Sequence, residues 1–121
     1  MNGGNLSPGS IVLIVHRPLG DPSAEKARPA LVVSSTVFNK GGLDVIVVAL
    51  SSVIRQGDSR QILIQDTDPS FSKTGLKVTS AIKCGALFAY PKNQIHRKLG
   101  MAPEPIVREV RAILVKFLTD D

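Results

Sequence analysis

The chain carries much of its positive charge in one long stretch that has no acidic residues. Between Pro69 and Pro103 there is no Asp or Glu. A surface of one charge sign attracts polyanions such as RNA, DNA or an acidic peptide. Ordinary solvated surface charges are the alternative interpretation of the same pattern. The basic residues of this stretch are Lys73, Lys77, Lys83, Lys92, Arg97 and Lys98, accompanied by His96.

Few other residues are candidates for catalysis or for metal binding. Cys84 is the single cysteine, so no intrachain disulfide can form, which fits a reducing compartment. No Cys/His cluster has the spacing of metal ligands, and we expect neither a metal nor a cofactor. His16 could titrate near neutrality and act as a base, although a half-buried imidazole with a backbone partner is the simpler interpretation. His96 is most simply a surface or RNA-contact residue.

Length and composition fit one compact, cytoplasmic domain over residues 1–121. The chain has 121 residues, a net charge of +5 and 43% apolar residues, which are ordinary values for a globular domain. Its longest apolar runs, residues 11–15 and 45–50, fall far short of the roughly 20 residues that span a bilayer. Residues 1–9 are polar and lack a signal-peptide core. We therefore expect no membrane association, and we expect residues 1–8 to be flexible.

Short apolar runs separated by Gly and Pro predict a mainly β fold. A helical turn is expected at residues 35–40. The run at 44–50 is apolar on both faces, which predicts a central strand. Short strands joined by such turns favour a small barrel or a curled sheet. The predicted strands cover residues 11–16, 30–34, 44–50, 60–65, 78–83 and, as a short sixth, 87–90.

The last part of the chain changes to a helical period. Pro103 and Pro105 lie in the first turn of this predicted helix, where proline costs least. The period predicts one amphipathic helix over residues 104–119 that closes a side of the barrel. The residues of its apolar face are Ile106, Val107, Val110, Ile113, Leu114, Phe117 and Leu118.

Five segments, in the right order over nearly the whole chain, resemble the MazF/PemK ribonuclease toxins. Residues 8–15 resemble that family's "GDIVLV" strand, residues 26–34 its "RRPALVVS" stretch, and residues 45–52 its "VIVCPITS" strand. Residues 75–84 resemble its "GL…SVIRCD" segment, and residues 97–100 its "KKIGKL" segment. The same terminal helix then follows.

This resemblance implies a fold, an activity and partners. It implies an SH3-like barrel that forms a homodimer and cleaves single-stranded RNA without metal, leaving a 2′,3′-cyclic phosphate. It also implies a cognate antitoxin whose acidic tail fills the RNA groove. By the same resemblance, Arg28 and Ser51 are the catalytic residues, where the guanidinium holds a phosphate and the hydroxyl donates to it. The alternatives are a surface Arg at a strand edge and a Ser that only forms a turn, and Ser52 could take the role of Ser51. Lys26, Ser52, Lys77 and Lys83 are the predicted RNA-binding residues.

The sequence departs from the family pattern at several of these places. Many members have an acidic residue after the cysteine, where this chain has Gly85 and Ala86. The family's Arg before the cysteine is Lys83 here, which keeps the charge and loses the planar fork. The sequence therefore indicates either a ribonuclease without an obvious general base or a relative that binds its target without catalysis. That target would be RNA or, as for the CcdB-type gyrase inhibitors, a protein. Phe71 is either a contact for a base or the antitoxin, or an apolar anchor of its loop.

Overall fold

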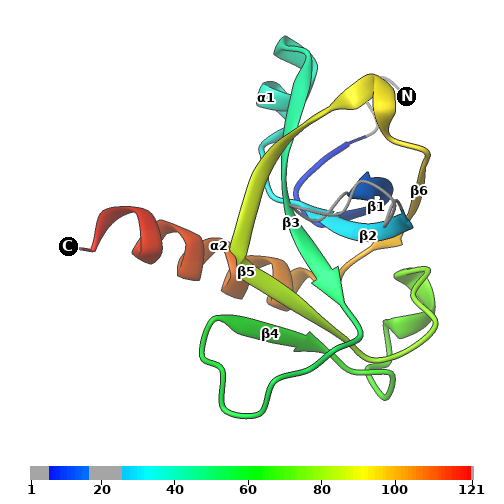
Figure 1. Ribbon diagram of the computed structural model, residues 1–121, viewed down its shortest axis with the longest axis vertical. Helices are drawn as coiled ribbons and strands as arrows, with labels where there is room; N and C mark the ends of the chain where they lie inside the picture. Colours follow the sequence, from blue (N-terminus) through cyan, green and yellow to red (C-terminus); the bar gives the residue numbers. More distant parts are fainter. Residues whose placement is uncertain (1–5, 17–25, 121) are drawn as a thin grey trace.

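The computed structural model describes residues 6–16 and 26–120. Its strands alternate with short turns and end in one long helix (Figure 1). Within these residues, the short 3-10 helices η2 (Phe71–Lys73) and η3 (Lys92–Gln94) lie in the connections. The main elements are β1 (Ser10–His16), β2 (Lys26–Val32), α1 (Thr36–Gly41), β3 (Asp44–Ser51), β4 (Gln61–Ile64), β5 (Ser80–Pro91), β6 (Arg97–Met101) and α2 (Glu104–Thr119).

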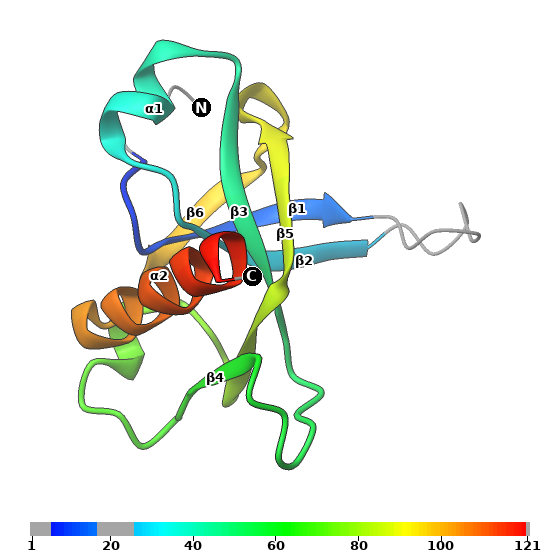
Figure 2. The ribbon, with the colours of Figure 1, turned by 90° about the vertical axis from the view of Figure 1, so that its left-hand side faces the viewer.

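The strands form one antiparallel sheet that curls into a half-barrel. Its strand order is β4-β5-β3-β2-β1-β6. Figure 2 shows α2 on one side of the sheet, with the ends of β1 and β2 pointing away from it. The predicted mainly β fold, a small barrel with a C-terminal helix, is confirmed. No helix within the described residues is both long and apolar enough to cross a membrane.

Apolar side chains are buried on both faces of the central strands. On one face Leu31 and Val48 pack in a core that includes Val110 of α2. On the other face Val32 and Val47 belong to a second core. This burial on both sides explains the apolar run of β3, and the strand is central as predicted, since it lies between β5 and β2.

Helix α2 has the predicted bounds, but its apolar face is only partly covered. Val107, Val110 and Leu114 are buried. Phe117 is 45% exposed and Leu118 is 72% exposed, so the C-terminal end of the predicted apolar face lies outside the core. The last turns of the helix extend past the edge of the sheet, where no strand lies beneath them (Figure 1).

Three strand predictions are corrected by the pairing. Strand β2 covers Lys26–Val32 instead of 30–34, because its first half pairs with β1. The two predicted strands at 78–83 and 87–90 form the single strand β5. Its register jumps from Val48–Leu87 to Ala49–Lys83, so residues 84–86 bulge from the ladder. Strand β6 was not predicted, and it exists through its pairing with β1.

The start of the described chain is anchored in the second core. Leu6 is fully buried, and the Nδ2 of the equally buried Asn39 donates to the Leu6 carbonyl at 3.0 Å. The same amide donates to the Ser34 carbonyl at 3.1 Å. The expected flexibility of residues 1–8 therefore does not fit Leu6, whereas residues 1–5 lie outside the described residues.

Candidate functional site

The site lies where β2 and β3 part. Their pairing runs from Val32–Val47 to Ala30–Ala49. Beyond that pair, β2 extends back to Lys26 and β3 extends forward to Ser51. Arg28 and Ser51 each lie two residues beyond this last pair, on the ends of the strands that part there. Arg28 is paired with Ile14 of β1, and Ser51 is paired with Ala81 of β5.

A groove of about 440 Å³ contains both residues. We call it the Arg28 groove. Leu13, Leu50 and Leu99 give it apolar walls. Its cations come from three separate segments, and all three are exposed. Its main polar residues are Arg28, Ser51, Ser52, Lys77, Ser80 and Arg97.

The chemistry of the groove is cationic and hydroxylic. None of the described residues that line it has a carboxylate or an imidazole. Guanidinium groups can bind a phosphate bidentately and stabilise the extra charge of a phosphorane. The arrangement can therefore bind a phosphodiester and stabilise charge that develops on it.

Ser51 combines a turn role with a free donor. Its Oγ accepts a hydrogen bond from the Val53 backbone N–H at 3.0 Å. That bond uses one lone pair of the hydroxyl and leaves its hydrogen available to donate. The turn interpretation and the phosphate-contact interpretation of Ser51 are therefore compatible.

The groove wall formed by residues 75–78 is held against β6 by close backbone contact. A Cβ at Gly100 would lie 2.1 Å from the Lys73 carbonyl oxygen, and one at Gly75 would lie 2.3 Å from that of Leu99. Gly75 also has a φ of +74°, which favours glycine. The loop that carries Lys77 is therefore fixed to the strand that carries Arg97.

The contacts of Phe71 distinguish between its two predicted roles, a ligand contact or an apolar anchor of its loop. Its side chain is half-buried and packs against the core beneath α2. Thr74 is fully buried, and its Oγ1 donates to the Phe71 carbonyl at 2.7 Å. Phe71 is thus an apolar anchor of the loop in this structure.

The model of one protein family covers almost the whole chain. The family described as PemK-like, MazF-like toxins of type II toxin–antitoxin systems matches residues 7–118. The chain belongs to this family. Comparison with the curated proteins gives no significant sequence match.

Solved structures of MazF proteins share the fold of this MazF-like toxin. A MazE–MazF structure from Deinococcus radiodurans is 18% identical with a TM-score of 0.75, covering 96% of this chain and 97% of that one. An endoribonuclease in complex with its cognate antitoxin, from mycobacterial species, is 19% identical with a TM-score of 0.72 and the same two coverages, 96% and 97%. The Mycobacterium tuberculosis toxin MazF-mt6 is 17% identical with a TM-score of 0.65, covering 90% and 96%.

The structure of this MazF-like toxin brings some of the predicted site residues together and separates others. Arg28, Ser51, Ser52 and Lys77 line one groove, whereas Lys26 and Lys83 do not line it. Lys26 is exposed at the start of β2. The prediction missed Arg97, although it lies in the acid-free stretch and in the last segment that resembles the family.

Lys83 lies in a second hollow, of about 310 Å³. We call it the Arg55 hollow. Its Nζ donates to Gln61 Oε1 at 2.8 Å. The backbone N–H of Arg60 donates to Asp58 Oδ1 at 2.9 Å, and with the nearby Arg60 guanidinium it holds the pKa of Asp58 below its usual range. The residues that line this hollow are Arg55, Asp58, Arg60, Lys83, Gly85 and Ala86.

The remaining candidates for chemistry are poorly placed. Cys84 is buried, and burial raises the pKa of its thiol to about 11, so it stays protonated and unreactive at neutral pH. His96 is exposed, and its backbone N–H donates to the Leu13 carbonyl at 2.9 Å. His16 belongs to β1, and its side chain lies outside the described part. Within residues 6–16 and 26–120, no three acidic, His or Cys side chains cluster in a way that could hold a metal.

Proposed function

We propose that this MazF-like toxin is an endoribonuclease that binds single-stranded RNA in the Arg28 groove and cleaves it without metal. The 2′-hydroxyl of the RNA would lose its proton and attack the adjacent phosphorus, and the P–O5′ bond would break. The 5′-oxygen would leave and take up a proton, so that the products are a 2′,3′-cyclic phosphate and a 5′-hydroxyl. The observation that supports this proposal is the convergence of Arg28, Arg97 and Lys77 with the Ser51 hydroxyl around apolar walls. A polyanion whose phosphates need charge stabilisation fits such a groove.

Each group has a role that follows from its chemistry. The guanidiniums of Arg28 and Arg97 bind the non-bridging phosphate oxygens, whose charge grows in the phosphorane. The Ser51 hydroxyl donates to the same oxygens. Lys77 contacts the backbone of the strand. No described lining residue is a carboxylate or imidazole that could act as a base, and a missing general base typically costs about 10²- to 10⁴-fold in rate. We therefore expect slow cleavage that relies on charge stabilisation.

The proposal extends to partners. The Deinococcus radiodurans structure contains MazE with MazF, and an acidic antitoxin tail would find charge complementarity in the Arg28 groove of this chain. We expect a cytoplasmic homodimer whose binding to RNA and to the antitoxin weakens with salt.

Cleavage of an unstructured RNA in the presence of a chelator tests the activity. Arg28→Ala should lose at least about 100-fold in rate, because one group that stabilises transition-state charge is removed. Arg28→Lys should recover only part of the loss, since it restores the charge without the fork. Arg108→Ala, at an exposed residue of α2, is the matched control. Unchanged cleavage by a folded Arg28→Ala protein would refute the site, and a product without a cyclic phosphate would refute the mechanism.

A second candidate is a toxin that acts by binding alone, as the CcdB-type toxins do. The absence of a base among the described residues of the Arg28 groove favours it. Growth arrest on expression with intact RNA pools would support this candidate over the ribonuclease.

A further inference from the structure

The Arg55 hollow and the Arg28 groove are neighbours on one face of the sheet. Ser51 pairs with Ala81, and Ala49 pairs with Lys83, along β3 and β5. Lys83 in turn pairs with Gln61 of β4. Paired residues share a face, and residues two apart on a strand return to it, so Ser51 and Lys83 are diagonal neighbours about 7–8 Å apart.

One amide, of Gln61, joins the Lys83 ammonium to the Arg55 backbone. Gln61 Oε1 accepts from Lys83 Nζ at 2.8 Å and from the Arg55 backbone N–H at 3.4 Å. Its Nε2 donates to the Arg55 carbonyl at 2.5 Å. The loop between β3 and β4 is thereby tied to Lys83, and Arg55 and Arg60 of that loop lie around the same hollow. Positions fixed in this way before binding lower the ordering cost of a ligand.

The composition of the hollow fits a phosphate. Three cations surround it, and the carboxylate of Asp58 is already engaged by Arg60. None of the described residues that line it is aromatic, so they offer no platform for stacking a base. Gly85 borders open space, because a Cβ there would meet nothing within 4 Å.

We propose that the Arg55 hollow is a second phosphate subsite, which holds a backbone phosphate of the same RNA strand that occupies the Arg28 groove. This inference rests on the proposed function, because it assumes that the groove binds RNA. It assigns phosphate contacts to Arg55, Arg60 and Lys83. Asp58 orients Arg60 and opposes the phosphate charge.

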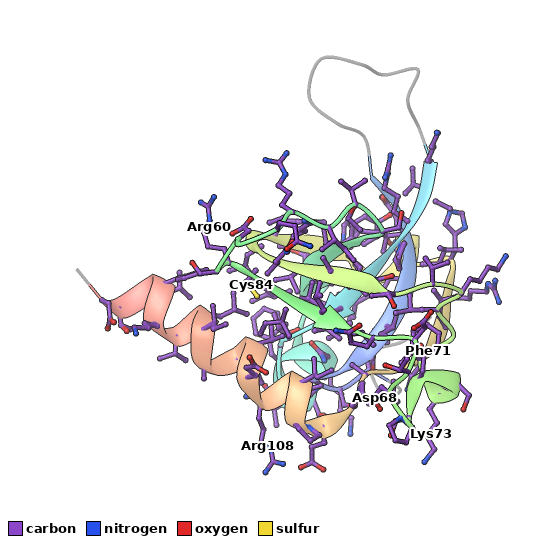
Figure 3. All side chains as sticks on the ribbon, turned by 90° about the horizontal axis from the view of Figure 1, so that it is seen from below. Arg60, Asp68, Phe71, Lys73, Cys84 and Arg108 are labelled. Atoms are coloured by element: carbon purple, nitrogen blue, oxygen red, sulfur yellow. The ribbon has the colours of Figure 1, made fainter. Side chains whose placement is uncertain are left out.

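Binding of a fully 2′-O-methylated RNA, which lacks the nucleophile, tests the subsite without cleavage. Arg55→Gln and Arg60→Gln should each weaken binding about five- to tenfold and lower the slope of log K against log salt by about 0.7. Arg108→Gln removes the same charge on the other side of α2, as Figure 3 shows, and should leave affinity nearly unchanged. Equal effects of all three variants would reduce the hollow to general surface charge and overturn the proposal.

Two further variants change the charge of the hollow in opposite directions. Asp58→Asn keeps the acceptor for the Arg60 N–H and removes a negative charge, so it should tighten binding about two- to fivefold. Gly85→Asp should weaken it by a similar factor. Gly41→Asp, where a Cβ also meets nothing within 4 Å, is the control for the added charge. Weaker binding by Asp58→Asn would show that the carboxylate contacts a base, and the phosphate assignment would be wrong.

A phosphate scan separates this inference from the proposed function. A set of RNAs is used in which each RNA has one phosphate replaced by a neutral methylphosphonate. At one position, this replacement should weaken binding to the wild type and leave binding to the double variant Arg55→Gln, Arg60→Gln unchanged. No such position would overturn the subsite. If the wild type binds RNA, Arg28→Ala weakens it and the Arg55 and Arg60 variants do not, the subsite alone fails. If the wild type binds no RNA, the proposed function fails with it.

Discussion

Replacing Gly100 by Ala tests how the groove wall is held. The added Cβ would lie 2.1 Å from the Lys73 carbonyl oxygen, and Cβ contacts below 3.0 Å are essentially never found in proteins. The backbones of β6 and of the loop must therefore move apart by about 0.9 Å to reach 3.0 Å. Overpacking of this kind costs about 1–3 kcal/mol, a large part of the stability of a small domain.

Urea unfolding followed by far-UV circular dichroism measures this cost, because the chain has no Trp. All samples should have the same protein concentration, since oligomerisation alters apparent stability. Gly42→Ala is the control, because a Cβ there meets nothing within 4 Å, and it should stay within about 0.5 kcal/mol of wild type. The rate of RNA cleavage by Gly100→Ala should fall by more than the loss of folded protein explains, because the displaced loop carries Lys77. A free energy of unfolding equal to that of the control would refute the close-contact argument.

Three further predictions concern the cores. Asn39→Asp should lower the free energy of unfolding by about 2–4 kcal/mol at neutral pH, because a carboxylate oxygen would face two backbone carbonyls. Part of this loss should be recovered in acid, where the carboxyl group is protonated. Unfolding curves at pH 4.5 and pH 7 measure both effects. The pKa of the Cys84 thiol is raised to about 11 from 9.0, so the native thiol should not react with a maleimide at pH 7.5. The free energy of unfolding should fall between pH 9 and 11, because only the unfolded chain loses the thiol proton in that range. If the wild type and Cys84→Ala had the same dependence of stability on pH, this prediction would be contradicted. Leu114→Ala should cost about 2–4 kcal/mol and Leu118→Ala less than about 0.5, as thermal unfolding of both variants can compare.

The sequence pattern correctly predicted those helices and strands whose formation depends on their own residues. The period of α2 and the two-sided apolar run of β3 depend on their own residues, and both predictions are confirmed. Strand β6 has no such signal, because Arg97–Met101 is half polar and becomes a strand only through hydrogen bonds to β1. Likewise, Gly85 and Ala86 indicate a break within β5, whereas the ladder resumes beyond them.

The candidate site shows the same limit. Arg28 and Ser51 were found because residues around each resemble family segments, and both line the Arg28 groove. The place of Arg97 depends on how β6 folds back along β1, which no local pattern encodes. The exposure of Phe117 depends on the length of the sheet beneath α2, and helical periodicity alone cannot report it.

Strand β6 is an outermost strand of the six, and it begins with Arg97 and Lys98. The open border of a sheet can recruit a strand from another molecule, and basic side chains on that border discourage such additions. We therefore expect the charge that we propose for binding RNA also to protect the protein against self-aggregation. Substitutions that neutralise this border to weaken toxicity would be expected to lower solubility as well.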